Sequence, residues 1–586
     1  MRLGALVGVL MLGLALPAAG AARTADAGPD RVLSRQAPAA SAQHRQPERS
    51  HAPTWSETLE QSRSRGERAG RDCDLGPGGG ASPQPGETGA APKRDPRAEL
   101  ARCRKLTDAD IVTAPITEVR RVTRHDVVID GKKLAYVATA GTLTIRDDQG
   151  KPTASMFYVA YTTGDPHRPV TFLYNGGPGS SSVWLHMGSL GPVRVLTDSP
   201  APTHGPPYQI VNNDQSLLDK SDLVFLDAVG AGFSRPLGDT PLAAFWGTDQ
   251  DIDAFARAIE RWLTINGRWN APKFLFGESY GTTRSAGLSY RLQQDGVQLN
   301  GVILLSSILN YGRRQPGFDQ EMINYLPSYA AAAAYHHKLA NPPADLSNFL
   351  AQVRDFARGP YAEALAEGQT LSQAERRRIA QQLSGYIGLP VDYLLQSDLR
   401  VTPGRFRKEL LRDRRLTIGR FDDRFTGVDM DAAGATPGYD PSDSGITGAF
   451  VAAFHDYLSR DLQYQTDLAY RVAYSAPGVA WDYRHRAPGG AGGGTDQADV
   501  ALDLSQAMRE NPHLLLYSLN GIYDLATPFF GTEYDLGHMQ LSPKLAQNVR
   551  FAYFPSGHMV YLNPEALKEM KADLVRFYDE AAPPTG

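Results

Sequence analysis

The fold of this 586-residue chain is decided by the stretch Phe274-Leu275-Phe276-Gly277-Glu278-Ser279-Tyr280-Gly281. A short apolar run, Lys273–Phe276, leads directly into a Gly-x-Ser-x-Gly motif, and helix-compatible residues follow it. A strand-to-helix turn this tight leaves no room for side chains two residues on either side of the serine, which explains both glycines. The pattern predicts a serine hydroxyl presented at a strand end. We therefore interpret Ser279 as a nucleophile rather than as an ordinary turn serine.

A serine hydroxyl is a weak nucleophile, so it needs a neighbouring base that is oriented by an acid. Asp524 follows the apolar run Leu514–Leu519, where the orienting acid belongs in the order serine, acid, histidine; the alternative is an Asp that stabilises a turn. Two histidines stand in a Gly-His-Met pattern. His558 follows the strand Arg550–Phe554, whereas His538 lies in a Gly-rich loop with no clear strand before it. We predict that His558 is the base and that His538 is a surface or cap-facing histidine.

Acyl transfer also needs two backbone donors for the tetrahedral oxyanion. Asn175-Gly176-Gly177-Pro178-Gly179 follows the apolar run Val170–Tyr174, at an early strand–loop junction that should supply one donor. The second should be the N–H of Tyr280, the residue after the nucleophile. Phosphate binding is the poorer interpretation of this loop, because no GKS or GKT follows and Pro178 lacks an N–H.

Several chain-wide patterns predict the domain organisation. Arg2 precedes an apolar run and small residues, the order of a secretory signal peptide, and a Pro-, Gly- and Arg-rich stretch with almost no aromatic residues follows. The predicted segments are a signal peptide (1–21), a disordered spacer or pro-segment (22–108), a first part of the core (109–308), a helical cap insertion (309–494) and a second part of the core (495–586).

The order of strand-like and helix-like runs predicts the fold class. The early runs alternate between apolar and polar residues, which is typical of antiparallel strands. They are Arg120–Ile129, Lys133–Ala138, Gly141–Arg146 and Ala154–Tyr161. A strand–loop–helix rhythm follows, with three buried parallel strands predicted at Leu223–Asp227, Lys273–Phe276 and Val302–Ser306 and helices such as Asp249–Ile265 and Ala340–Phe356. This organisation predicts an α/β-hydrolase fold, with a central, mostly parallel sheet flanked by helices and an inserted, mainly helical cap.

Composition narrows the functional classes. A formal net charge of −4 gives no polycation signature, so nucleic acid is not an expected partner. The 13 histidines are scattered without metal-ligand spacing, and we predict neither a metal nor another cofactor. The only cysteines, Cys73 and Cys103, either form a disulfide or stay unpaired. No stretch after the signal is long and apolar enough to be a transmembrane helix, so no membrane association is expected once the signal is removed.

Together these blocks resemble the serine carboxypeptidase family (peptidase family S10). The matching segments are Asn175–Gly179 with Ser181-Ser182, Gly191-Pro192, Phe225–Ser234, Gly277–Gly281, Asn520–Asp524 and Gly557-His558-Met559. The resemblance implies Ser279 as nucleophile, His558 as base, Asp524 as orienting acid, and the N–H groups of Gly177 and Tyr280 as the oxyanion hole. It also implies that Asn175 and Glu278 bind the carboxylate of a substrate's free C-terminus.

The chain departs from the family pattern at three positions. Ser189 stands where the family has a second Glu that helps to bind the carboxylate, Ser180 replaces a frequent cysteine, and Leu173 replaces a usual Trp. We therefore predict an exported, periplasmic or extracellular serine peptidase that releases C-terminal residues from peptides. The alternatives are an esterase or acyltransferase that uses the same three residues, and a non-catalytic binding protein on a hydrolase scaffold.

Overall fold

A computed structural model describes residues 114–583, apart from residues 316, 476–477 and 490–493. The predicted signal peptide (1–21), the predicted spacer (22–108) and both cysteines lie outside the described residues. Among the helices of the described part, none is both long and apolar enough to cross a membrane.

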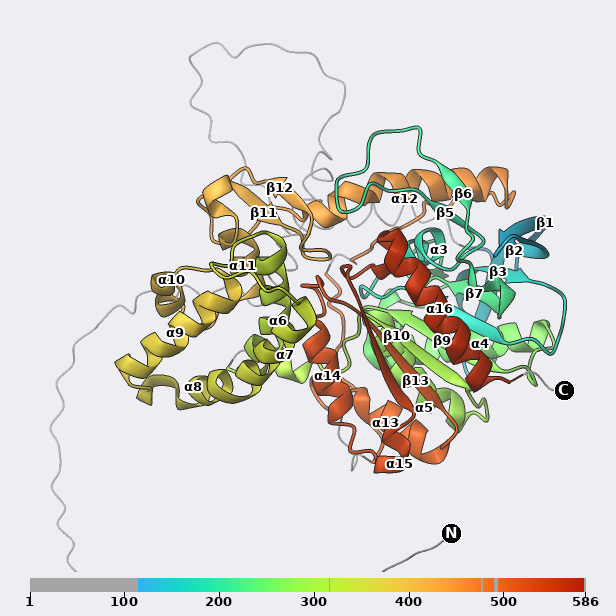
Figure 1. The fold of residues 1–586 in the computed structure, drawn as a ribbon. Coiled ribbons are helices and arrows are strands. Elements are labelled where there is room, and N and C mark those ends of the chain that lie inside the picture. Colours follow the sequence, from blue (N-terminus) through green and yellow to red (C-terminus); the bar gives the residue numbers. More distant parts are fainter. Residues whose placement is uncertain (1–113, 316, 476–477, 490–493, 584–586) are drawn as a thin grey trace, which may run out of the picture. The chain divides into compact units, whose positions relative to one another are not determined.

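A ten-stranded sheet lies at the centre of this part of the chain (Figure 1). Strands β1 to β3, β7 and β8 form antiparallel pairs, whereas β7, β4, β9, β10, β13 and β14 run parallel to one another. In sheet order the strands are β1 (Arg120–Ile129), β2 (Lys132–Arg146), β3 (Pro152–Thr162), β7 (Asp222–Leu226), β4 (Val170–Tyr174), β9 (Lys273–Glu278), β10 (Gly301–Leu305), β13 (Leu515–Gly521) and β14 (Val549–Phe554), and β8 (Arg235–Pro236) pairs with β3. A two-stranded sheet of β5 (Val193–Val195) and β6 (Ile210–Asn212) is separate.

The parallel strands are buried on both faces. In β4, Phe172 and Leu173 belong to two different hydrophobic clusters, and Leu275 and Phe276 do the same in β9. One cluster includes helices α4 (Thr248–Ile265), α5 (Tyr280–Gln294) and α13 (Ala501–Glu510); the other includes α3 (Val183–Gly188), α12 (Pro441–Arg460) and α16 (Pro564–Ala581). Helices on both faces of a mostly parallel sheet confirm the predicted α/β-hydrolase fold.

One strand boundary was predicted wrongly. The two predicted strands Lys133–Ala138 and Gly141–Arg146 form one continuous strand, β2. Gly141 lies inside the ladder, paired with Arg120 on one side and Tyr158 on the other. A Cβ at this position would lie 2.4 Å from the carbonyl oxygen of Val119. The glycine therefore permits a close backbone approach inside a strand, rather than marking a turn.

A mainly helical block connects β10 to β13 and forms a third hydrophobic cluster, which also includes Leu525 and Phe529 from the segment after β13. Its elements before α12 are α6 (Gln320–Tyr335), α7 (Leu346–Phe356), α8 (Ala362–Glu367), α9 (Gln373–Ile387), α10 (Val391–Gln396), α11 (Pro403–Glu409), β11 (Leu416–Ile418) and β12 (Thr426–Val428). The predicted start of α7 at Ala340 was wrong: two prolines precede the helix, and the side chain of Asp345 caps it by accepting from the N–H of Asn348. The domain boundaries stay predictions.

After α12 the helical block is interrupted, and the described residues between 461 and 500 contain no helix. This segment pairs instead with loops of the sheet. The N–H of Ser181 donates to the carbonyl of Val472 (2.8 Å), and that of Tyr474 donates to the carbonyl of Gly179 (2.8 Å). Backbone pairing with these loops replaces the helical bonds that the sequence led us to expect there. Two short helices lie between β13 and β14, namely α14 (Phe529–Gly537) and α15 (Pro543–Ala546).

Candidate active site

Ser279 lies at the turn between β9 and α5. Its backbone has φ 61° and ψ −130°, a conformation that costs free energy for a residue with a side chain and that recurs at functional sites. A Cβ at Gly277 would lie 2.1 Å from the carbonyl oxygen of Gly281. A Cβ at Gly281 would lie 2.7 Å from the carbonyl oxygen of Tyr174. The two glycines are thus required by the close packing of the turn. The serine itself is half-buried, at the N-terminus of α5.

The glycine loop after β4 packs directly on this turn. A Cβ at Gly176 would lie 2.3 Å from the backbone nitrogen of Tyr280, so only glycine permits the approach. The next residue, Gly177, has φ +104°, which also favours glycine. The structure therefore brings together the two segments that were predicted to donate to an oxyanion.

Asp524 and His558 form a buried pair. Oδ2 of Asp524 lies 2.7 Å from Nδ1 of His558, and both side chains are buried. The other carboxylate oxygen accepts from the backbone N–H groups of Ala526 (2.7 Å) and Thr527 (3.0 Å). Because a carboxylate faces Nδ1, that nitrogen carries the proton, and Nε2 is left as the basic nitrogen.

The end of β10 connects the serine to the histidine. The N–H of Ser279 donates to the carbonyl of Leu305 (3.0 Å), and the hydroxyl of the adjacent Ser306 donates to the carbonyl of His558 (2.6 Å). Two consecutive residues at the end of β10 thus bind the segments that carry Ser279 and His558. The carboxyl ends of neighbouring parallel strands meet at one edge of a sheet, which is where ligands bind in this class of fold.

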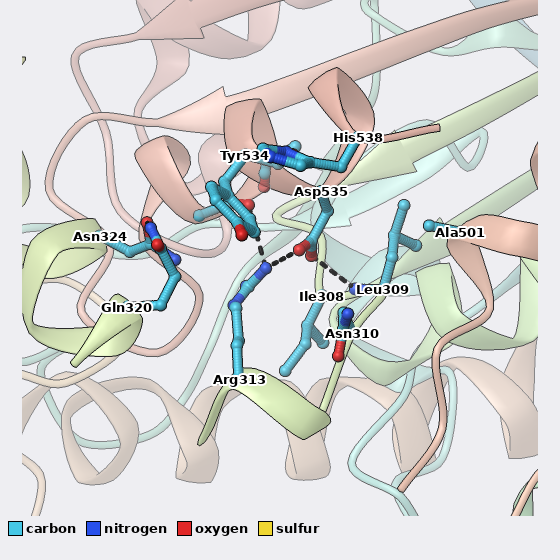
Figure 2. A network of polar contacts seen from close by, with 12 residues as sticks. Ile308, Leu309, Asn310, Arg313, Gln320, Asn324, Ala501, Tyr534, Asp535 and His538 are labelled. Carbon is cyan, nitrogen blue, oxygen red and sulfur yellow. Dashed lines mark hydrogen bonds and ion pairs between the residues drawn. The ribbon is translucent and has the colours of Figure 1, made fainter. Parts of the chain in front are cut away.

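The competing histidine lies elsewhere. His538 is the residue after α14, exposed, with its ring stacked on Tyr534 at 3.9 Å between centroids (Figure 2). The predicted Gly-rich loop around it is wrong, since the preceding residues are helical, but the predicted surface position is confirmed. Of the two Gly-His-Met histidines, His558 is the one that contacts Asp524.

Helix α14, which begins just after the Asp524 loop, is anchored by a buried ion pair (Figure 2). Asp535 accepts from the guanidinium of Arg313 and, at 3.1 Å, from the N–H of Leu309. Burial lowers the pKa of Arg313 to about 9, with the neighbouring Arg314 adding to the effect. These contacts join α14 to the segment after β10 and so fix the end of the Asp524 loop that leads into α14.

Glu278, the residue before the nucleophile, is a buried carboxyl group. Burial raises its pKa from 4.5 to about 7, against the effects of His558, Tyr561 and Asn175, which lower it. The hydroxyl of Tyr561 donates to Oε2 of Glu278 (2.9 Å). The side-chain oxygen of Asn175 accepts from the N–H of Leu185 (2.9 Å), which fixes the orientation of its amide. The structure thus places Asn175 and Glu278 together, beside the candidate nucleophile.

Arg284 donates a hydrogen bond to the backbone of the glycine loop that follows β4. Its side chain is fully buried and donates to the carboxylate of Asp251 at 2.7 and 3.2 Å. It also donates to the backbone carbonyl of Asn175 (2.8 Å), and its guanidinium lies 4.0 Å from the ring centroid of Phe255. One side chain therefore connects α4, α5 and the loop that carries the predicted oxyanion donor.

Several residues with direct contacts to this site were not identified from the sequence, among them Thr527, Phe421, Tyr561 and Arg284. Thr527 lies three residues after Asp524 and donates to its Oδ2 (2.8 Å), a local spacing that could have identified it. Phe421 accepts the N–H of His558 (2.5 Å) from the helical block, far away in the chain, where no local signal exists. Over residues 114–583, as far as they are described, no group of three or more His, Cys, Asp or Glu side chains is arranged to hold a metal ion.

Comparison with known proteins is consistent with this geometry. The model of the serine carboxypeptidase family matches residues 132–315, a range that contains Asn175, Gly177 and Ser279 but neither Asp524 nor His558. The match confirms the predicted resemblance and the predicted enzyme class, a serine-type carboxypeptidase.

The solved structures to which this chain is similar include two peptidases. Kex1, a prohormone-processing carboxypeptidase from Saccharomyces cerevisiae, is 15% identical, with 76% of this chain and 91% of that chain covered and a TM-score of 0.45. A proline iminopeptidase from Mycobacterium smegmatis is 15% identical, with 75% and 98% covered and a TM-score of 0.31.

Proposed function

We propose that this protein is a peptidase that releases C-terminal residues from peptides through an acyl-enzyme on Ser279. The serine carboxypeptidase pattern over residues 132–315 supports the proposal. The observation that carries the proposal is the shared support of nucleophile and base. Leu305 binds the backbone of Ser279, Ser306 binds that of His558, and His558 in turn contacts Asp524. Nucleophilic acyl transfer requires a serine near a histidine base that an acid orients, and this shared support favours such an arrangement.

In the proposed mechanism, Oγ of Ser279 attacks the carbonyl carbon of the last peptide bond while Nε2 of His558 takes the hydroxyl proton. The N–H groups of Gly177 and Tyr280 donate to the oxyanion that forms. His558 then passes the proton to the leaving amine, so the peptide C–N bond breaks and the C-terminal residue departs. Water, deprotonated by His558, attacks the acyl-enzyme and regenerates Ser279. Throughout, Asp524 keeps the proton on Nδ1 and stabilises the imidazolium.

Selection of a free C-terminus is assigned to Asn175 and Glu278. A protonated carboxyl group can donate a hydrogen bond to a substrate carboxylate, whereas an ionised one repels it. With a pKa of about 7, Glu278 is protonated in acidic and mildly acidic solution, even though Tyr561, Asn175 and His558 favour its ionised form. Burial thus provides the donor that recognition of an anionic C-terminus requires.

The pH dependence of cleavage tests this recognition. Below about pH 7 Glu278 is protonated and binds the substrate carboxylate, whereas above pH 7 its charged form repels the substrate. On this alkaline limb of the pH profile, kcat/KM for a free-acid peptide should fall about tenfold per pH unit. The C-terminal amide of the same peptide should be cleaved poorly and lack this limb. Glu278→Gln, which cannot titrate, should remove the limb. Rates measured from pH 5 to 9 check this; equal cleavage of acid and amide would contradict the assignment.

We further propose that the protein is exported to the periplasm or the exterior. The support is the order of Arg2, the apolar run from Leu3 to Leu16 and the small residues that follow. N-terminal sequencing of the mature protein after expression would detect cleavage near residue 21, and an intact Met1 on the mature protein would refute this proposal.

A further inference from the structure

Tyr561 contacts Glu278 directly, although no sequence pattern assigned it a role. It lies in a short helical turn, η8 (Val560–Leu562), just after His558. Its hydroxyl donates to Oε2 of Glu278 (2.9 Å), and each of the two side chains is only 2% exposed. Asn175 is a hydrogen-bonding neighbour of both groups. The phenol thus belongs to the group of polar side chains that faces the proposed carboxylate site.

The ring of Tyr561 packs beside the position at which the family resemblance expects a second Glu. A Cβ at Gly188 would lie 2.6 Å from this ring, so the last residue of α3 must be glycine to admit it. The next residue is Ser189, which stands at that Glu position and is fully buried. Its hydroxyl donates to the carbonyl of Leu185 (2.5 Å) in the helix that it caps. The serine is therefore engaged locally, and a phenol from a different segment is the partner of Glu278.

We propose that Tyr561 is a positioning residue for the substrate carboxylate: its hydroxyl holds one oxygen of Glu278, so that the other oxygen is directed to the C-terminus of the peptide. It takes the place of the second carboxyl group that Ser189 lacks. This inference rests on the proposed function, because it concerns the same carboxylate site.

A phenol behaves differently from a second carboxyl group. Burial, followed by the nearby charge of Glu278, raises the pKa of Tyr561 well above its usual range, so its hydroxyl stays protonated and always donates. Two carboxyl groups would have to share one proton, whereas here Glu278 alone titrates. The groups facing Glu278 are His558, Tyr561 and Asn175, which lower its pKa, and Asp524, which raises it, while burial has the largest effect. Recognition of a free C-terminus should thus persist to nearly neutral pH.

The test is Tyr561→Phe, which keeps the ring on Gly188 and removes only the hydroxyl. For a free-acid peptide, kcat/KM at pH 6 should fall about tenfold, mainly through KM, because Glu278 loses its orienting hydrogen bond. The alkaline limb should move to higher pH, because a donor that lowers the pKa of Glu278 is gone. An ester of the same peptide, which has no carboxylate, should change less than about twofold, since about 0.4 kcal/mol separates twofold rates.

Matched variants separate this role from a purely structural one. Tyr553→Phe removes a hydroxyl that donates to the carboxylate of Glu533 (2.9 Å) from a partly exposed ring. This variant should change neither kcat/KM for the acid or the ester nor the position of the alkaline limb. In a Glu278→Gln background, Tyr561→Phe should shift no limb, because the titrating group is absent. This second background also serves if the single Tyr561 variant is poorly folded.

The outcomes distinguish a failure of the proposed function from a failure of the role assigned to Tyr561. If the wild-type enzyme cleaves acid and amide equally, the proposed function and this inference both fail. If the wild type prefers the acid but Tyr561→Phe affects acid and ester alike, or leaves the alkaline limb in place, the inference alone fails.

Discussion

Replacing Ser279 by alanine is expected to lower kcat/KM for peptide hydrolysis about 10⁴-fold or more, the largest effect that the structure predicts. The reason is chemical: without Oγ no acyl-enzyme forms, and only the binding and oxyanion contributions remain. The fold should be preserved, because the backbone of Ser279 makes the contact with Leu305 and no side-chain bond is lost from the sheet. Steady-state rates together with a thermal melt measure both quantities.

The matched control is Ser459→Ala, at an exposed position near the end of α12. It should leave the rate unchanged within about twofold, because surface substitutions away from special features have small effects. Peptide hydrolysis by Ser279→Ala at the rate of this control would contradict the assignment of the nucleophile.

The second large effect is expected at His558. His558→Ala removes the base that takes the proton of Ser279, so kcat should fall about 10⁴-fold or more while KM changes little. It also leaves the buried carboxylate of Asp524 without its histidine, although the N–H groups of Ala526 and Thr527 and the hydroxyl of Thr527 still donate to it. Burst and steady-state kinetics with an activated ester separate the loss of acylation from any loss of binding.

His538→Ala is the internal comparison for this variant, since it removes the other Gly-His-Met histidine. His538 is exposed and stacks on Tyr534 at the end of α14 (Figure 2), so its loss should change kcat less than about twofold. If the two variants have similar activity, His558 is not the base.

The sequence predicted those parts of the fold and of the site that depend on local chemistry. Gly277 must be glycine because the turn itself excludes a Cβ there, whereas at Gly281 a Cβ would meet the end of β4 at Tyr174. The position of His558 after an apolar strand distinguished it from His538. Strand ends were less well predicted. Gly141 was interpreted as the boundary between two strands, because the sequence alone does not distinguish a glycine in a turn from a glycine that permits a close approach of another backbone segment.

The unpredicted contacts are those made across the fold. Phe421 reaches His558 from the helical block, and Arg284 reaches Asn175 from α5, through packing that no local pattern records. Tyr561 is close to His558 in the chain, yet its partner Glu278 lies at the end of β9, far away in the sequence, so no local pattern indicates the contact. The roles of Gly177 and Tyr280 as oxyanion donors, and of Asn175 and Glu278 as carboxylate ligands, stay predictions until tested.

The most direct test of the central claim is to treat the wild-type protein with a fluorophosphonate and locate the adduct by peptide mapping. Such probes react with a serine only when a neighbouring base activates it. A single adduct on Ser279, absent from Ser279→Ala and strongly reduced in His558→Ala, is the predicted result. Modification of a different residue, or no modification of the folded protein, would show that Ser279 is not an activated nucleophile.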